Sequence, residues 1–180
     1  MIDGVGLMDV AVLGSMLAAC VTDLKDQRIP NSLTIWLWPL GIGYFLVRGA
    51  LGLDPFYTGI LGFLVAFPIH LFFWRIGLDR GGDAKLMIGV GACFGWALML
   101  EATLWSLVAM GPVALVIMTL RGKLPNLWRS VRYIALSVLH RVRGLVPPEA
   151  PEQTYVAKAP VILAGFLLAR FTPWLDITWS

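Results

Sequence analysis

Long uninterrupted apolar blocks constrain this chain more than any other feature of its sequence. Six blocks, at residues 5–22, 33–47, 59–74, 86–100, 102–120 and 160–175, come near the roughly 20 residues that an α-helix needs to cross a bilayer. Of the 180 residues, 58% are hydrophobic and only 14% are charged, which is too little charge to cover a soluble domain. The sequence therefore predicts an all-α polytopic membrane protein with about six transmembrane helices, forming one membrane-embedded domain over residues 1–180.

The basic residues indicate how the spans are oriented. Twelve of the 14 Lys and Arg residues follow the first, third or fifth block, and the two exceptions are Arg48 and Arg170. The positive-inside rule makes the basic side cytoplasmic, which places both termini outside the cell (inner) membrane. Asp3 and Asp9 precede or begin the first block where a signal peptide would carry positive charge, so we expect this block to be retained as a span.

Residues 124–143 differ from the apolar blocks. Their apolar residues recur at helical spacing, and Arg129, Arg132, Arg141 and Arg143 fall mostly elsewhere on the helical wheel. The pattern predicts a basic amphipathic helix on the cytoplasmic membrane surface, within a basic segment and linker at 121–158, with anionic lipid as a partner. An ordinary solvated helix packed on the bundle is the alternative. Nucleic acid is not an expected partner, because the other basic residues lie in short loops between spans.

The cysteines argue against a metal or disulfide framework. Cys20 and Cys93 each lie within an apolar block, and the chain has no CxxC motif. A structural zinc site is therefore not supported, and we expect neither a metal nor a cofactor.

Two polar segments at block ends carry candidate chemistry. Thr-Asp-Leu-Lys-Asp-Gln-Arg-Ile-Pro-Asn at 22–31 contains Asp23, and Arg-Gly-Gly-Asp-Ala-Lys-Leu at 80–86 contains Asp83. The chain crosses the membrane twice between them, so both carboxylates lie on one face. Carboxylates beside hydrocarbon are costly and tend to be functional, and a facing pair can act as general base and general acid on a water. We therefore predict that Asp23 and Asp83 form a catalytic pair.

Each aspartate also has a structural interpretation. Asp83 fits a helix N-cap, and Asp23 fits a loop residue paired with Lys25 or Arg28. The helix dipole predicts that Asp83 rests as the carboxylate that activates water, whereas Asp23 starts protonated. The nearby Asp26 and Asp79 are interpreted as plain loop charges, whose replacement by Asn should keep most activity.

The glycines before Asp83 suggest a close approach. Gly81 and Gly82 remove side chains beside the carboxylate, which would admit an extended substrate backbone. A simple turn before a helix is the alternative.

The two segments resemble the motifs of the type IV prepilin peptidases. That family has an Asp seven residues before a Pro in D-x-x-x-x-x-[IL]-P-[ND], which Asp23, Pro30 and Asn31 match. Its second motif is G-x-G-D followed by x-K-L, which is matched at 82–86 except that Arg80 stands where the first Gly is expected. The resemblance covers about residues 10–120.

The resemblance implies a membrane aspartic endopeptidase that removes the cytoplasmic leader from prepilin or pseudopilin precursors. It assigns catalysis to the two aspartates and site-shaping roles to Pro30, Asn31, Gly81, Gly82 and Lys85. Larger members of the family carry a cytoplasmic insert with paired CxxC motifs and also methylate the product. This chain has no such insert and is similar to the short, peptidase-only members of Flp/Tad pilus systems and to preflagellin peptidases, so no N-methyltransferase activity is expected.

Two other functions compete with this interpretation. In a small ion- or proton-coupled transporter subunit, the two aspartates would bind a cation or relay protons, although such acids are expected nearer mid-membrane. In a non-catalytic pilus or secretion assembly factor, the fold would persist without activity.

Overall fold

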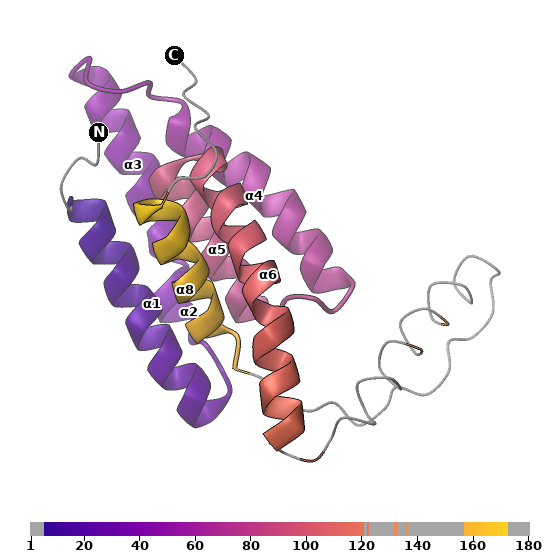
Figure 1. The fold of residues 1–180 in the computed structure, drawn as a ribbon. Helices are drawn as coiled ribbons and strands as arrows, with labels where there is room; N and C mark the ends of the chain where they lie inside the picture. Colours follow the sequence, from indigo (N-terminus) through magenta and orange to yellow (C-terminus); the bar gives the residue numbers. More distant parts are fainter. Residues whose placement is uncertain (1–5, 121, 123–131, 133–135, 137–156, 173–180) are drawn as a thin grey trace. The chain divides into compact units, whose positions relative to one another are not determined.

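The computed structural model describes residues 6–120, 122, 132, 136 and 157–172. Every regular element among these residues is a helix, which confirms the predicted all-α class. The helices, drawn in Figure 1, are α1 Leu7–Asp26, α2 Asn31–Thr34, α3 Leu37–Ala50, α4 Thr58–Arg75, α5 Gly81–Phe94, α6 Trp96–Leu120 and α8 Ala159–Phe171. The chain divides into one unit of Met1–Ala109 with Ala157–Ser180 and a second unit of Met110–Val156. Both predicted aspartates lie in the first unit.

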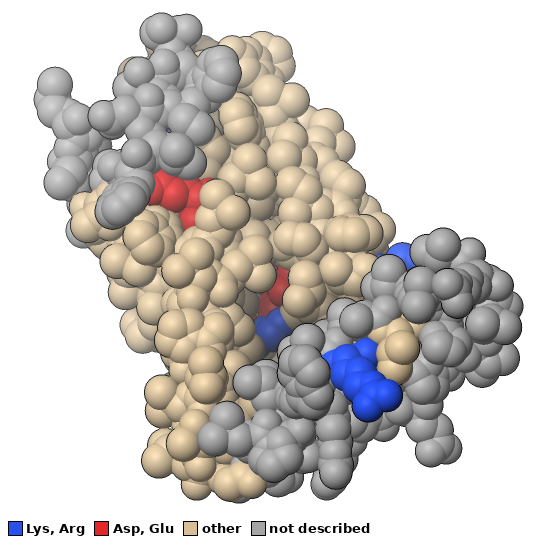
Figure 2. Space-filling model, turned by 45° about the vertical axis from the view of Figure 1, so that its right-hand side comes forward, with Lys and Arg blue, Asp and Glu red and all other residues tan. Residues whose placement is uncertain are grey.

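The membrane character of the chain is confirmed by its helices. Within the described part of the chain, four stretches are long and apolar enough to cross a membrane, namely α1, Asn31–Ala50, α4 and α6. Helix α8 is apolar but has 13 residues, and α5 has 14, so the expected count of six spans is not confirmed. On the face shown in Figure 2, charged side chains of described residues reach the surface at only a few places.

The boundary between α5 and α6 differs from the prediction. The sequence suggested a turn at Glu101, between blocks 86–100 and 102–120. In the structure the turn is Gly95, whose φ of 85° lies in a region that side chains rarely adopt. Glu101 is buried within α6. Because α5 begins at Gly81 rather than near residue 86, Asp83 lies inside its first turn.

Glycines let the backbones of α3 and α4 come into close contact with that of α5. A Cβ on Gly62 of α4 would lie 1.9 Å from the carbonyl oxygen of Gly91 in α5. A Cβ on Gly41 of α3 would lie 2.5 Å from the carbonyl oxygen of Ala92. Such small-residue contacts are a common means of helix association in membranes. They fix α5, the helix that carries Asp83, between α3 and α4.

Helices α1 and α8 lie side by side and run antiparallel (Figure 1). At one end, the Arg170 Nε donates to Asp9 Oδ1 over 2.8 Å. Asp9 is almost fully buried, and a buried carboxylate requires such a partner. At the other end, α8 begins beside Asp23. The pairing of α1 with α8 therefore determines what surrounds the first predicted aspartate.

The basic amphipathic helix predicted at 124–143 and the linker after it lie outside the described residues, apart from Arg132 and Leu136. This helix and its binding of anionic lipid stay predictions.

Candidate active site

Asp23 and Asp83 line the same cavity. The two carboxylates come from α1 and α5, and both residues are buried, with exposed fractions of 3% and 2%. The cavity has a volume of about 250 Å³. Its lining residues are Asp23, Gln27, Arg28, Ile29, Arg80, Gly81, Gly82 and Asp83. The structure thus brings together the two segments that the sequence singled out.

Asp23 occupies the last turn of α1 rather than the loop after it. The helix ends at Asp26, and the residue after it, Gln27, has a left-handed backbone with a φ of 55° and donates its N–H to the Asp23 carbonyl. The Asp23 side chain accepts a hydrogen bond of 3.1 Å from the backbone N–H of Ala159, the first residue of α8. A helix N-terminus stabilises negative charge, so Asp23 has a favourable partner that α1 alone does not supply.

Asp83 lies in the first turn of α5, outside the helices that are long and apolar enough to cross a membrane. Its Oδ2 accepts the backbone N–H of Arg80 over 3.2 Å. Burial raises the pKa of Asp83 to about 6. The Arg80 N–H and the Lys158 ammonium oppose this rise in pKa, whereas the carboxylates of Asp23 and Asp79 add to it.

These surroundings differ from the ones on which the expected division of roles was based. The helix dipole alone gave Asp83 the charged form and Asp23 the proton. In the structure both side chains accept an N–H at a helix N-terminus, so the helix dipole no longer distinguishes the two carboxylates. Burial outweighs the helix terminus for Asp83 and favours its protonated form.

Direct contacts hold the two segments against each other. The Lys85 ammonium donates to Asn31 Oδ1 over 2.8 Å, joining α5 to α2. Pro30 is the N-cap of α2, with an extended backbone that turns the chain from the Asp23 segment into this helix. The Trp38 indole N–H donates to the Lys85 carbonyl over 3.0 Å and ties α3 to the same turn. The predicted site-shaping residues Lys85, Asn31 and Pro30 therefore connect the segments.

Arg80 does not strain the backbone where the family motif has glycine. Its φ of −89° and ψ of 162° describe an extended conformation that any residue adopts. Its guanidinium donates to the Gln27 carbonyl in a long hydrogen bond of 3.5 Å. The arginine thus adds a further contact between the two segments.

The two glycines before Asp83 have different surroundings. A Cβ on Gly82 would lie 2.7 Å from the Cβ of Ile29, so the space beside Gly82 is filled by this chain's own loop. Gly82 nevertheless lines the aspartate cavity, and its approach to a substrate backbone stays a prediction. Gly81 is open, because the nearest atom to its added Cβ is the Trp74 Nε1 at 4.0 Å.

A second, apolar cavity adjoins the aspartate cavity and shares Gly81 with it. Its volume is about 240 Å³. It is lined by Trp38, Phe67, Leu71, Trp74, Gly81, Ala84, Lys85 and Ile88. The site therefore consists of two adjoining cavities, one with carboxylates and one apolar.

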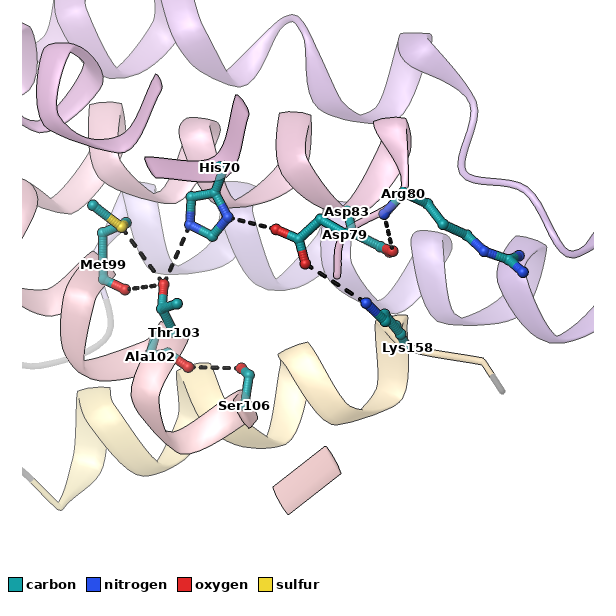
Figure 3. Close-up of polar contacts among 9 residues, drawn as sticks. All are labelled: His70, Asp79, Arg80, Asp83, Met99, Ala102, Thr103, Ser106 and Lys158. Carbon is teal, nitrogen blue, oxygen red and sulfur yellow. Dashed lines mark hydrogen bonds and ion pairs between the residues drawn. The ribbon is translucent and has the colours of Figure 1, made fainter. Parts of the chain in front are cut away.

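Sequence reasoning missed the buried surroundings of Asp79. It was interpreted as a loop charge, but its side chain is only 14% exposed and lies between two partners (Figure 3). His70 Nδ1 lies 2.8 Å from one of its carboxylate oxygens, and Lys158 Nζ lies 3.7 Å from the other. No local pattern places residue 158 beside residue 79, whereas a His inside an apolar block was an available hint of a buried polar partner. Asp26, by contrast, is exposed.

The comparison with known families shows the family of this chain. A model of the type IV leader peptidase family matches residues 10–115, which is more than half of the chain. The chain belongs to the type IV leader peptidase family. The family resemblance inferred from the motifs is confirmed, and this leader peptidase is a protease with a precursor protein as its substrate partner. No curated protein and no solved structure gives a significant match.

The matched stretch contains both aspartates but ends before α8. The N–H that Asp23 accepts therefore comes from a part of the leader peptidase that the family model does not cover. The family model alone would not have drawn attention to Lys158 or Ala159.

Gly82→Ala is expected to lower the rate of leader cleavage by about 10- to 100-fold. The new Cβ would meet Ile29 at 2.7 Å, and relief of that clash moves the loop that follows Asp23 away from Asp83. The measurement is the cleavage rate of a precursor by the purified variant in detergent. Gly43→Ala is the matched control, because a Cβ at that helical glycine meets nothing within 4 Å. Wild-type cleavage by Gly82→Ala would show that the Ile29 contact does not set the geometry of the pair.

Proposed function

We propose that this leader peptidase is an aspartic endopeptidase that removes the cytoplasmic leader from prepilin or pseudopilin precursors. The observation that carries the proposal is the single cavity lined by two buried carboxylates, Asp23 and Asp83, in a chain of the leader peptidase family. Two acids that share one proton can deliver both the general base and the general acid that peptide hydrolysis needs.

The roles follow from the surroundings of each acid. Burial raises the pKa of Asp83 to about 6, so Asp83 is protonated more readily than an ordinary aspartate, and we assign to it the proton that the pair shares when cleavage begins. Asp23 is the carboxylate, held by the Ala159 N–H, and it takes a proton from the attacking water. Asp83 gives its proton to the oxygen of the scissile carbonyl as that oxygen gains charge. When the tetrahedral intermediate collapses, Asp23 gives the proton taken from water to the leaving amine, and Asp83 recovers its proton from the former carbonyl oxygen as the C=O bond re-forms.

The apolar cavity supports a direction for the substrate. A precursor whose leader ends just before an apolar helix presents a polar bond next to apolar side chains. The bond would lie at the aspartates, and the first apolar side chains would lie between Trp38 and Trp74, with the open Gly81 between the two cavities. The basic residues of the neighbouring loops support the cytoplasmic side of the inner membrane as the location of this site.

Co-expression with candidate prepilins tests this function. We expect each true substrate to lose its leader, seen as a gel shift, and its new N-terminus to be unmethylated by mass spectrometry. Cleavage by the purified protein should survive strong chelation, because the sequence lacks the paired CxxC motifs and the insert of the larger members. Loss of cleavage on chelation, or a methylated product, would contradict the peptidase-only assignment.

A further inference from the structure

We propose that Asp79 is a positioning residue for the catalytic pair, and that it acts through Lys158 at the start of α8. The inference rests on the proposed function and adds to it a residue outside the motifs that define the site. Figure 3 shows the arrangement: His70, Asp79 and Lys158 lie in a row, with Asp83 beside them.

His70 fixes Asp79 from within the helix bundle. The ring of His70, on α4, is 2% exposed, and each of its nitrogens has a partner. Nδ1 contacts Asp79 at 2.8 Å, and Nε2 contacts the Thr103 hydroxyl at 3.3 Å. That hydroxyl in turn donates to the Met99 carbonyl over 2.8 Å. A side chain held in this way has one orientation, and so does the carboxylate that it contacts.

Asp79 then fixes the N-terminus of α8. Its second oxygen pairs with Lys158, the N-cap residue of α8, at 3.7 Å. The next residue, Ala159, donates its N–H to Asp23. A chain of contacts therefore runs from His70 through Asp79 and the start of α8 to the first catalytic carboxylate.

The same two charges act on the second catalytic carboxylate. The groups that influence Asp83 are the Arg80 N–H, Lys158 on α8, Asp23 on α1 and Asp79. Asp79 raises the pKa of Asp83 and Lys158 lowers it. Asp79 thus has two effects: it places the N–H at Asp23, and it offsets the positive charge near Asp83.

The test compares Asp79→Asn and Lys158→Met in the full-length protein, with cleavage of one precursor measured from pH 5 to pH 9. Each variant is expected to lower kcat by about 10- to 100-fold, with KM changed less than about threefold. Cleavage requires protonated Asp83, so its pKa appears as the alkaline limb of the profile. That limb should move to lower pH in Asp79→Asn, which loses a negative neighbour, and to higher pH in Lys158→Met, which loses a positive one.

Opposite shifts of the alkaline limb in the two variants distinguish the proposed role from a general structural defect. A general defect would lower activity without moving the limb to lower pH in one variant and to higher pH in the other. The double variant should be no slower than the slower single variant, because the two residues act in series. Asp26→Asn is the matched control, since that carboxylate is exposed and does not line the cavity.

Two results would overturn the inference: a folded Asp79→Asn variant with wild-type kcat and profile, or limbs that move the same way in both single variants. If Asp79→Asn does not fold, Lys158→Met and Lys158→Arg decide the matter, with Arg expected to keep kcat within about threefold because it keeps the charge. Unchanged kcat and profile in Lys158→Met would overturn the inference in that case. Absence of cleavage by the wild-type protein would instead refute the proposed function.

Discussion

Asp23→Asn and Asp83→Asn are each expected to reduce leader cleavage by at least about 100- to 10,000-fold while the protein still inserts and folds. Asn keeps the size of the side chain and its ability to accept the N–H of Ala159 or Arg80, but it can neither take nor give the proton that hydrolysis requires. The measurement is the initial rate of precursor cleavage by purified variants, with thermal unfolding in detergent as the check on folding.

Asp26→Asn should keep most activity, because Asp26 is exposed and lies outside the cavity. Substantial cleavage by a folded Asp23→Asn or Asp83→Asn variant would remove the aspartic mechanism. A transporter subunit or a non-catalytic assembly factor would then be the better interpretation of this chain.

Asp83→Asn is also expected to stabilise the protein, by about 3 kcal/mol above pH 6. The pKa of the folded-state carboxyl is about 6 against an ordinary value of 3.8, and each unit of difference corresponds to about 1.4 kcal/mol. A raised pKa means that the aspartate contributes most stability below pH 3.8 and loses it as the pH rises through 6. The neutral amide of the variant does not titrate, so it loses no stability as the pH rises. The variant therefore becomes more stable than the wild type over this range.

Thermal unfolding from pH 4 to pH 8 measures this difference. The melting temperature of Asp83→Asn should exceed that of the wild type most at pH 7 to 8, and the gap should close toward pH 4. Asp26→Asn should show no such gap, because the side chain is exposed. A variant that melts at or below the wild-type temperature at pH 8 would contradict the cost that we assign to burying Asp83.

The sequence predicted the parts of the site that local chemistry determines. Asp23 and Asp83 were identified from their positions at the ends of apolar blocks, and the parity of crossings placed them on one face. Lys85 and Asn31 were identified as site-shaping residues through the family resemblance, and they are joined by a hydrogen bond. These features depend on residues close in sequence or on a motif of fixed spacing.

The remaining features depend on distant packing. Ala159 lies 136 positions from the carboxylate it contacts, and Asp79 contacts a lysine near the same helix start. The raised pKa of Asp83 could not be predicted, because it comes from burial, which outweighs the N–H at the helix start that sequence reasoning used. The turn at Gly95 was missed because a charged residue, Glu101, looked like the natural place for it.

The contact between Ala159 and Asp23 has a consequence for how the enzyme is made. Helix α1 leaves the ribosome first and α8 follows all the other described helices, so the nascent chain carries both aspartates before the N–H that holds Asp23 exists. During synthesis the carboxylate pair is incomplete. The contact to Asp23 forms only when residue 159 has been translated and has docked on α1, so the surroundings of the pair are completed after helices α1 to α6 have been made.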